Sequence, residues 1–379
     1  MIYFDAGATT LEKPAAVRAA MAEAVATMCS PGRGGYPATR KAEETAFACR
    51  NEAAELFGVD SPEKVIFTSN ATHGLNIAIQ SLVKSGSRVV ISGYEHNSVL
   101  RPLHAVGDIE LTVVDTPLFE PQKAWEEFHN VLQRGVDVVI CTHVSNVFGY
   151  ILPVEEIARE CCRRGVPLII DASQSAGVLP VRMDVLQPAF IAMPGHKGLY
   201  GPQGTGLLLC GDWPTKPLLC GGTGSVSRLQ EMPEDLPDRL EAGTHNMPGI
   251  AGLLEGLRFI RRTGLEQIAR QEKEVVAAAA KYLREMPQVR LFAKEDFSNQ
   301  TGVLSFVVEG LDCETVGARL AEKGIAVRAG LHCSPLAHKT VGTLESGTVR
   351  LSVSAFNNVK QAELFARELR GIIRENARF

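Results

Sequence analysis

Short apolar runs alternate with longer helical patterns between residues 14 and 210, and this alternation limits the possible folds more than any other feature of the sequence. Apolar runs of about four to six residues separated by helices are typical of a mostly parallel sheet covered by helices on both faces. The predicted strands are residues 64–68, 88–92, 136–143, 167–171, 190–193 and 206–210, and the predicted helices are residues 14–28, 38–57, 72–84 and 153–164.

The pattern changes after about residue 248. A long helical region with a break at residues 263–264 comes first, and an amphipathic helix over residues 358–375 comes last. Between them the sequence predicts strands at residues 302–308, 326–328 and 349–353 and a helix at residues 313–323. We therefore expect an α/β protein with a large domain over residues 14–248. Residues 1–13 and 249–379 form the expected smaller α+β domain.

Charge and apolar content exclude several classes of function. The 379 residues include 39 Lys and Arg against 43 Asp and Glu, without the basic patch of nucleic-acid-binding proteins. The first ten residues do not resemble a secretory signal, and the most apolar window, residues 136–154, is too polar to span a membrane. Nine cysteines without a C-x-x-C pair argue against a zinc site, so we expect no metal. These features predict a soluble, cytoplasmic protein with reduced thiols.

Polar residues follow five of the predicted strands. In α/β sheets, ligands bind at the carboxyl ends of the strands. One of these ends opens a helix, whose free backbone amides can bind an anion such as phosphate. An ordinary helix cap or a surface side chain would explain each residue alone, but their convergence on one edge favours a shared site. The residues are Ala71 and Thr72, His96, Asn146, Asp171 with Gln174, and His196 with Lys197.

Lys197 is the most informative of these residues. It lies in a glycine-rich stretch after a predicted strand, and Asp171 ends the preceding strand. Pyridoxal phosphate needs a lysine for covalent attachment, an acid that keeps its pyridine nitrogen protonated, and an anion site for its phosphate. The run 201–206 contains a proline and follows the lysine, so it is not a dinucleotide-binding fingerprint. The sequence therefore predicts a pyridoxal phosphate site.

At these residues the sequence resembles the class V aminotransferase-fold enzymes, specifically the cysteine desulfurase and selenocysteine lyase branch. The resemblance implies a fold-type I pyridoxal-phosphate-dependent transferase. The segment 328–333 is similar to the compact active-site loop of the SufS-like group. The matching motifs occur in order at residues 3–10, 71–76, 95–97, 145–149, 171–174, 195–197, 241–246, 328–333 and 349–352.

The resemblance implies a role for each residue around the cofactor ring. Lys197 would bind the cofactor covalently, and Asp171 would bond its pyridine nitrogen. His96 would stack on the ring and take part in catalysis. Asn146 and Gln174 would reach the side of the phenolic oxygen, with Asn146 also contacting the substrate.

The resemblance also implies how the phosphate is bound. Ala71 and Thr72 would bind it at the start of a helix, with His196 nearby. Thr244 would reach the phosphate from the other subunit, which implies a homodimer with shared active sites. Two positions depart from the family pattern and concern this phosphate site: Pro194, where relatives commonly have a hydroxyl residue, and His245, where relatives often have proline.

The expected substrate residues lie at both ends of the chain. Arg350 would bind the substrate carboxylate, because a planar guanidinium matches a carboxylate with two parallel hydrogen bonds. Arg33 would contribute near the substrate entrance. Cys333 would accept sulfur, and we expect the neighbouring Arg328 and His332 to favour its thiolate, which is the nucleophile.

Together these residues predict a cysteine desulfurase that converts L-cysteine to L-alanine and leaves the sulfur on Cys333 as a persulfide. Three alternatives stay open: a selenocysteine lyase acting on L-selenocysteine, another class V lyase or transaminase, and a non-catalytic sulfur-handling protein. A sulfur-acceptor protein is an expected partner. The sequence does not identify this acceptor, so iron–sulfur assembly, tRNA thiolation, selenium metabolism and cofactor synthesis are all compatible with it.

Overall fold

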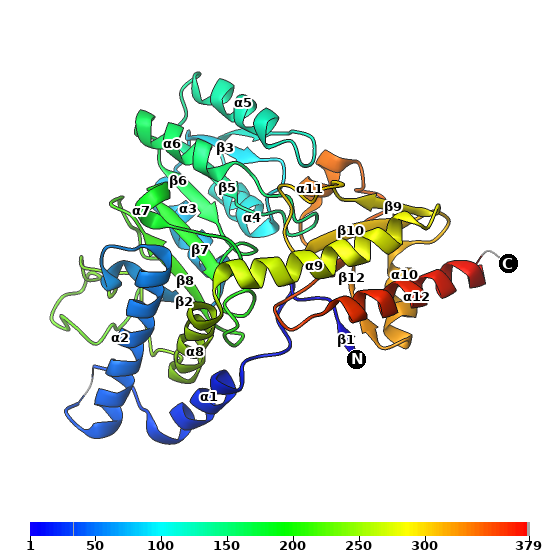
Figure 1. Ribbon diagram of the computed structural model, residues 1–379. Coiled ribbons are helices and arrows are strands. Elements are labelled where there is room, and N and C mark those ends of the chain that lie inside the picture. Colours follow the sequence, from blue (N-terminus) through cyan, green and yellow to red (C-terminus); the bar gives the residue numbers. More distant parts are fainter. Residues whose placement is uncertain (33, 377–379) are drawn as a thin grey trace.

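The centre of the protein is a seven-stranded sheet, seen in a computed structural model that describes residues 1–32 and 34–376 (Figure 1). Its strands follow the order β2-β8-β7-β6-β5-β3-β4. Each strand except β4 lies within a residue or two of a predicted apolar run. The strands are β2 (Val65–Thr68), β3 (Arg88–Ser92), β4 (Glu110–Val114), β5 (Val138–Thr142), β6 (Leu168–Asp171), β7 (Phe190–Pro194) and β8 (Gly206–Cys210).

Strand β8 is the one antiparallel member of this sheet. It runs against both of its neighbours, β7 and β2. Two reversals restore the original direction, so β2 points the same way as the parallel strands β3 to β7. The carboxyl ends of six strands therefore lie on one edge, as expected for a mostly parallel α/β sheet. The predicted fold class is confirmed.

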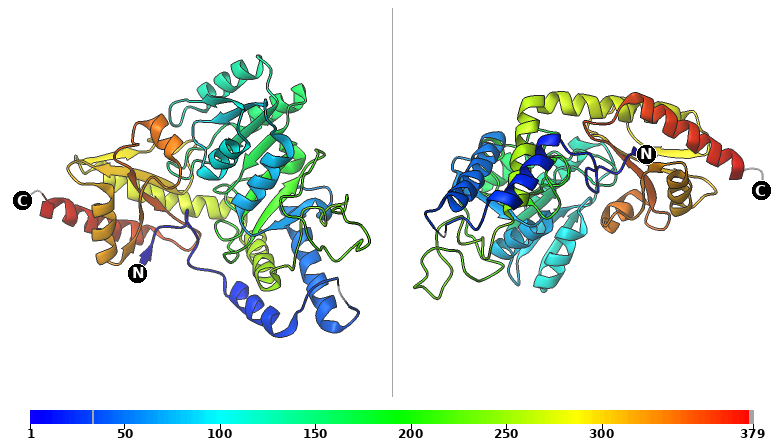
Figure 2. Two further views of the ribbon diagram at one scale, coloured as in Figure 1. Left: turned by 180° about the vertical axis from the view of Figure 1, so that it is seen from behind. Right: turned by 90° about the horizontal axis from the view of Figure 1, so that it is seen from below.

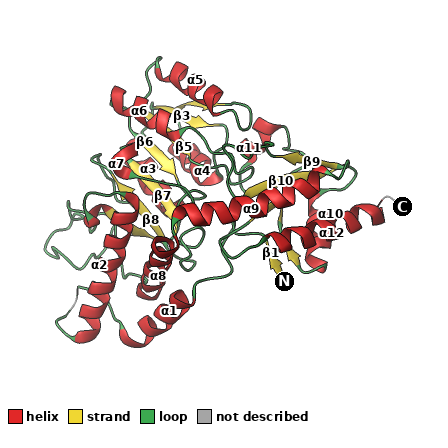
Figure 3. Ribbon diagram, viewed as in Figure 1, coloured by secondary structure: helices red, strands yellow, loops and turns green. Residues whose placement is uncertain are grey.

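Helices cover both faces of this sheet (Figure 3). Alternate residues of each strand point to opposite faces, and the buried residues accordingly form two separate clusters. One cluster includes α3 (Ala71–Leu82) and α4 (Asn97–Val106). The other includes α2, α5, α6, α7 and α8, which span Pro37–Phe57, Pro121–Leu132, Val154–Arg164, Met183–Leu186 and Met247–Thr263. Helix α1 (Ala15–Thr27) packs on α8, and a short 3-10 turn, Pro62–Lys64, leads into β2.

A second, antiparallel sheet lies beside the first, with strand order β12-β13-β10-β9. Its core also contains apolar residues of α9, α10 and α12 and the N-terminal Phe4. The elements are α9 (Leu265–Arg284), β9 (Val289–Phe292), β10 (Val303–Val308), α10 (Cys313–Glu322), β12 (Arg328–Gly330), α11 (Pro335–Val341), β13 (Thr348–Ser352) and α12 (Val359–Asn376).

The N-terminus joins this second region rather than the large sheet. Strand β1 (Ile2–Tyr3) pairs in parallel with β11 (Ile325–Ala326). The described chain therefore begins and ends on the side of the smaller sheet, as both views in Figure 2 show.

The predicted break in the long helical region is confirmed. Helix α8 ends at Thr263, and α9 begins at Leu265. Gly264 between them has φ of +86°, a conformation that glycine adopts without a steric penalty. The apolar residues of α8 pack in the core of the large sheet, whereas those of α9 pack mainly with the smaller sheet. The division at residues 248 and 249 remains a prediction.

None of the helices within the described residues is long and apolar enough to cross a membrane.

Candidate active site

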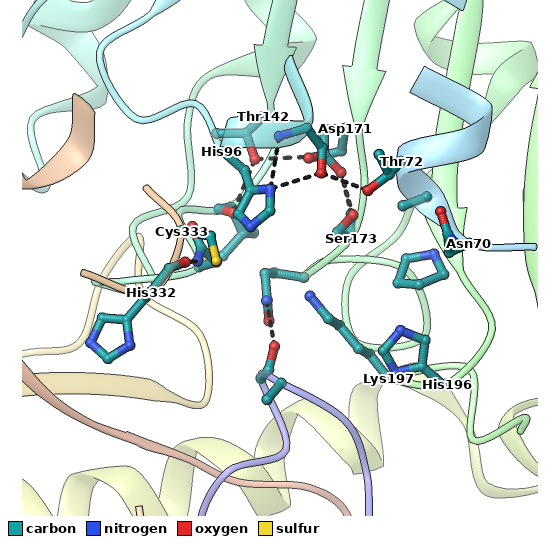
Figure 4. Close-up of a pocket in the computed structure, with 18 of the residues that line it drawn as sticks. Asn70, Thr72, His96, Thr142, Asp171, Ser173, His196, Lys197, His332 and Cys333 are labelled. Carbon is teal, nitrogen blue, oxygen red and sulfur yellow. Dashed lines mark hydrogen bonds between the residues drawn. The ribbon is translucent and has the colours of Figure 1, made fainter. Parts of the chain in front are cut away.

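The carboxyl edge of the large sheet and the smaller sheet together enclose a cavity of about 230 Å³ (Figure 4). Ten of the twelve site residues expected from the sequence line it. The large-sheet side contributes most of them, and the smaller sheet contributes two. The ten residues are Ala71, Thr72, His96, Asn146, Asp171, Gln174, His196, Lys197, Cys333 and Arg350.

Lys197 extends into the middle of this cavity from the turn after β7 (Figure 4). Among the described residues, none forms a hydrogen bond with its Nζ atom. Burial, and then the nearby charge of Arg350, lower the pKa of Lys197 to about 8. The N-terminal segment fixes this turn, because the Thr10 amide and Lys13 Nζ each donate to the His196 carbonyl at 3.0 Å. The backbone that carries this amine is thus held in place, and the amine is more easily deprotonated than that of an ordinary lysine.

Asp171 and His96 lie on neighbouring parts of the same wall. Asp171, 3% exposed, accepts a hydrogen bond from the Ser173 amide at 2.9 Å. The His96 Nδ1 atom accepts from the Ser98 amide at 3.0 Å, so the ring proton resides on Nε2. Burial lowers the pKa of His96 to about 4 despite the opposing influence of Asp171. His96 is therefore a neutral ring at physiological pH.

The start of α3 forms one end of the cavity. Asn70 caps this helix by accepting from the His73 amide at 2.9 Å, and the Ala71 and Thr72 amides remain available to an anion. The Thr72 hydroxyl bonds the Ser98 hydroxyl at 2.7 Å, which connects this end with the His96 wall. His196 also lines the cavity, and burial lowers its pKa to about 4. Its Nδ1 atom is buried without a partner among the described residues.

Arg350 contributes a buried cation from β13 and is only 2% exposed. One of its terminal nitrogens donates to Asp5 Oδ1 at 2.7 Å, and the other donates to the Asn146 carbonyl at 2.9 Å. Its Nε atom is buried and unpaired within the described part of the chain. Arg328, opposite it on β12, also lines the cavity. Two neighbouring guanidinium groups make this wall a natural binding site for a carboxylate.

Cys333 is exposed and lies on the side of the cavity opposite Lys197 (Figure 4), in the turn between β12 and α11. His332 and Cys333 have φ of +50° and +57°, an uncommon left-handed conformation for residues other than glycine. The Cys333 carbonyl accepts from the Asn97 amide at 2.9 Å, which attaches the turn to the start of α4. Such strain at two successive residues is typical of a functional loop that its surroundings hold in place.

The expectation that His332 favours the Cys333 thiolate is wrong. The His332 side chain is 5% exposed and extends away from the Cys333 sulfur (Figure 4), and its Nε2 atom lies 3.1 Å from the Thr348 carbonyl. Burial, followed by the charge of Arg350, lowers its pKa to about 2. A neutral imidazole directed elsewhere cannot stabilise a thiolate by charge, even though His332, like Arg328, lines the same cavity as Cys333.

The remaining two expected residues are Arg33 and Thr244. Arg33 lies outside the described residues. Thr244 lines a separate cavity of about 270 Å³, together with Ser69 and His245. The His245 Nε2 atom lies 3.3 Å from a carboxylate oxygen of Glu241, which also pairs with the buried Arg50, so this departure from the family pattern contacts a buried ion pair. Pro194 ends β7 and lines the main cavity without a hydroxyl group.

Sequence reasoning did not assign several polar residues that organise the site. Ser98, Ser173 and Asp5 each bond a predicted residue directly. Ser98 and Ser173 both lie two positions after a predicted residue, where short polar side chains commonly bond the neighbouring backbone or side chain. Asp5 is separated from Arg350 by 345 positions, so local spacing gave no signal for this pair.

Comparisons of the sequence and of the structure identify known proteins that are similar to this chain. The family model described as aminotransferase class-V matches residues 2–365. A probable cysteine desulfurase of Methanothermobacter thermautotrophicus is 31% identical over 98% of this chain and 94% of its own. The chain spans 55% of the length of a second relative, a probable cysteine desulfurase of Mycolicibacterium paratuberculosis that is 30% identical. The apo structure of a cysteine desulfurase from Thermococcus onnurineus NA1 superposes with a TM-score of 0.89 at 31% identity, covering 99% of this chain and 95% of that one.

Proposed function

The chain belongs to the aminotransferase class-V family, and from this we propose that it is a pyridoxal-phosphate-dependent cysteine desulfurase. The substrate is L-cysteine, the product is L-alanine, and the sulfur remains on Cys333 as a persulfide. The observation that carries the proposal is the shared cavity, which is lined by a lysine whose amine has no hydrogen-bond partner among the described residues, by a buried arginine and by an exposed cysteine. The similarity to proteins named cysteine desulfurase over nearly the whole chain supports the same reaction.

The residues of the cavity fit pyridoxal phosphate. Lys197 provides an amine with no competing partner among the described residues, and Asp171 provides a buried carboxylate on the adjacent strand. The first turn of α3 provides backbone amides for the phosphate, and His196, whose buried Nδ1 atom has no partner among the described residues, lines the same cavity. The neutral His96 ring can lie against the cofactor without repelling a protonated pyridine nitrogen.

Each step of the reaction then has a residue to perform it. Arg350 binds the substrate carboxylate, and Lys197 takes the proton from the substrate Cα. The bound cofactor supplies an electron sink for the pair that this proton leaves behind. The Cys333 thiolate attacks the substrate sulfur, which forms the S–S bond while the Cβ–S bond breaks. The electron pair of that bond returns to carbon, which takes up protons to give alanine, so no outside oxidant is needed.

We also propose a homodimer. Thr244 does not line the cavity of its own chain, and it lies beside Ser69, close in sequence to the start of α3. A second copy that brought its Thr244 to this helix start would complete the phosphate site. The sulfur acceptor is expected to be another protein, since the exposed Cys333 can present a persulfide to it.

The lowered pKa of Lys197 predicts how covalent loading of the cofactor depends on pH. Only the neutral amine attacks the aldehyde, and a pKa of about 8 leaves roughly one tenth of the amine neutral at pH 7. Mixing the apoprotein with pyridoxal phosphate should give an attachment rate that rises about tenfold per pH unit up to pH 8 and then levels off. The absorbance change of the cofactor measures this rate. A rate that keeps rising up to pH 10 would mean that Lys197 behaves as an ordinary lysine.

The direct test of the function is incubation of the cofactor-loaded protein with L-cysteine. We expect alanine to accumulate, and we expect mass spectrometry of the peptides to locate one added sulfur on Cys333. In the presence of a reducing thiol, alanine and sulfide should form in equal amounts. Alanine without sulfur on Cys333, or no alanine at all, would contradict the proposed reaction.

A further inference from the structure

Asn146 connects the cavity to the turn that carries Cys333. Its Nδ2 atom donates to the His332 carbonyl at 2.9 Å, and its Oδ1 atom accepts from the Ser334 hydroxyl at 2.6 Å. The one amide therefore binds the residue before Cys333 and the residue after it. Since Asn146 follows β5 of the large sheet, these two bonds attach the cysteine turn to the opposite side of the cavity.

The Ser334 hydroxyl is committed to this contact. Ser334 is fully buried and occupies the N-cap position of α11, yet its side chain makes no capping bond to that helix. Serine at an N-cap normally accepts a hydrogen bond from the first turn, which stabilises the helix. Here the hydroxyl donates to Asn146 instead. The contact with Asn146 thus replaces a common local interaction rather than adding to it.

The turn needs such support because its backbone is strained. Two successive residues, His332 and Cys333, hold left-handed φ values. Conformations of this kind persist only where surrounding contacts determine them. The Asn146 side chain bonds the His332 carbonyl and the Ser334 hydroxyl, and the Asn97 amide donates to the Cys333 carbonyl. These contacts, together with the bond from the Ser334 amide to the Leu331 carbonyl, hold the backbone that carries the Cys333 side chain.

The same asparagine contacts the residue that we assign to the substrate carboxylate. Its backbone carbonyl accepts a hydrogen bond from Arg350 at 2.9 Å, and both residues line the cavity. We propose that Asn146 and Ser334 form a positioning pair, which holds Cys333 toward a substrate bound at Arg350. Ser334 touches no reacting atom and acts through Asn146. This inference rests on the proposed function, because it concerns the sulfur transfer to Cys333.

The variant Ser334→Ala tests the pair in the cofactor-loaded protein. In a single turnover with L-cysteine, we expect persulfide formation on Cys333 to slow about tenfold. The cofactor absorbance change on adding L-cysteine, and its concentration dependence, should stay within about twofold of the unaltered protein, because Arg350 and Lys197 are intact. Alkylation of Cys333 by iodoacetamide in the apoprotein should also change in rate by several fold, a readout that needs no catalysis.

A matched control is available on the same helix. The Thr340 hydroxyl donates to the Gly93 carbonyl at 2.9 Å, so it also joins α11 to the large-sheet side but does not contact Asn146. Thr340→Val removes that bond at nearly constant volume and should leave persulfide formation and Cys333 alkylation unchanged. An equal loss in Thr340→Val would mean that any weakened contact of α11 has this effect, which would overturn the proposal.

A combined variant checks that Ser334 acts through Asn146. If the two residues act as one unit, adding Ser334→Ala to Asn146→Ala should change the alkylation rate no further and slow persulfide formation no further, whereas independent residues would show additive effects. Unchanged rates in Ser334→Ala alone would also refute the pair. Failure of the unaltered protein to form alanine would instead refute the proposed function, so the two failures are distinguishable.

Discussion

Replacing Lys197 with alanine should reduce desulfuration by about a thousandfold or more and should remove covalent cofactor binding. The amine carries two functions in the proposed reaction, attachment of the cofactor and transfer of the Cα proton. Positioned proton transfer alone contributes about 10²–10⁴-fold. Borohydride reduction of the loaded protein, followed by peptide mapping, should label position 197 in the unaltered protein and no position in Lys197→Ala.

Lys13 provides a matched control for this variant. It is another partly buried lysine whose pKa burial lowers to about 8, and its amine bonds the His196 carbonyl. Lys13→Met should weaken the support of the turn and lower activity modestly, yet the borohydride label should remain on Lys197. A label on Lys13 in the unaltered protein, or normal turnover in Lys197→Ala, would contradict the assignment of the lysine.

Replacing Cys333 with serine is expected to have the second largest effect, a loss of about a hundredfold or more in alanine formation from L-cysteine. A hydroxyl group is a far weaker nucleophile than a thiolate toward sulfur. The cofactor should still bind, because Cys333 lies across the cavity from Lys197 (Figure 4). Within the described part of the chain, no hydrogen bond joins the two side chains. The measurements are alanine formation, persulfide by mass spectrometry, and the absorbance of the bound cofactor.

Cys162 offers the control for Cys333→Ser. It is also exposed, and it lines a separate cavity next to Asp184. Cys162→Ser should leave both alanine formation and the persulfide on Cys333 unchanged.

L-Selenocysteine as the substrate distinguishes a cysteine desulfurase from a selenocysteine lyase, because its selenium can leave with less help from an enzyme thiol. Cys333→Ser that loses activity on L-cysteine but keeps it on L-selenocysteine would indicate a selenocysteine lyase, and full activity on L-cysteine would refute the role of Cys333.

The elements that bury continuous apolar runs were predictable from the sequence. Strands β3 and β8 match the predicted ranges, because every residue but one in them is buried. Strand β4 was not predicted, since it is the edge of the sheet and only its last residue is buried. Helix α4 contains an internal proline, Pro102, which disguised its helical pattern. The sequence thus indicated the centre of the sheet well and its margin poorly.

The site was predictable where its residues directly follow strands and unpredictable where distant segments meet. Asp171 and Lys197 follow adjacent strands, so the rule for α/β sheets was sufficient to group them. The pairing of Asp5 with Arg350 depends on how the N-terminus reaches the smaller sheet. His332 shows a different limit, because its position beside Cys333 in the sequence gave no information about where its ring points.

The placement of the N-terminal segment has a consequence for biosynthesis. Strand β1 pairs with residues 325 and 326, and Asp5 reaches Arg350, 345 positions later, so residues 2–5 leave the ribosome long before their partners do. Domains generally begin to fold while the chain is still emerging. The large sheet can therefore form early, with its catalytic edge still open, and residues 2–5 would reach their places only after residues 325–350 have emerged.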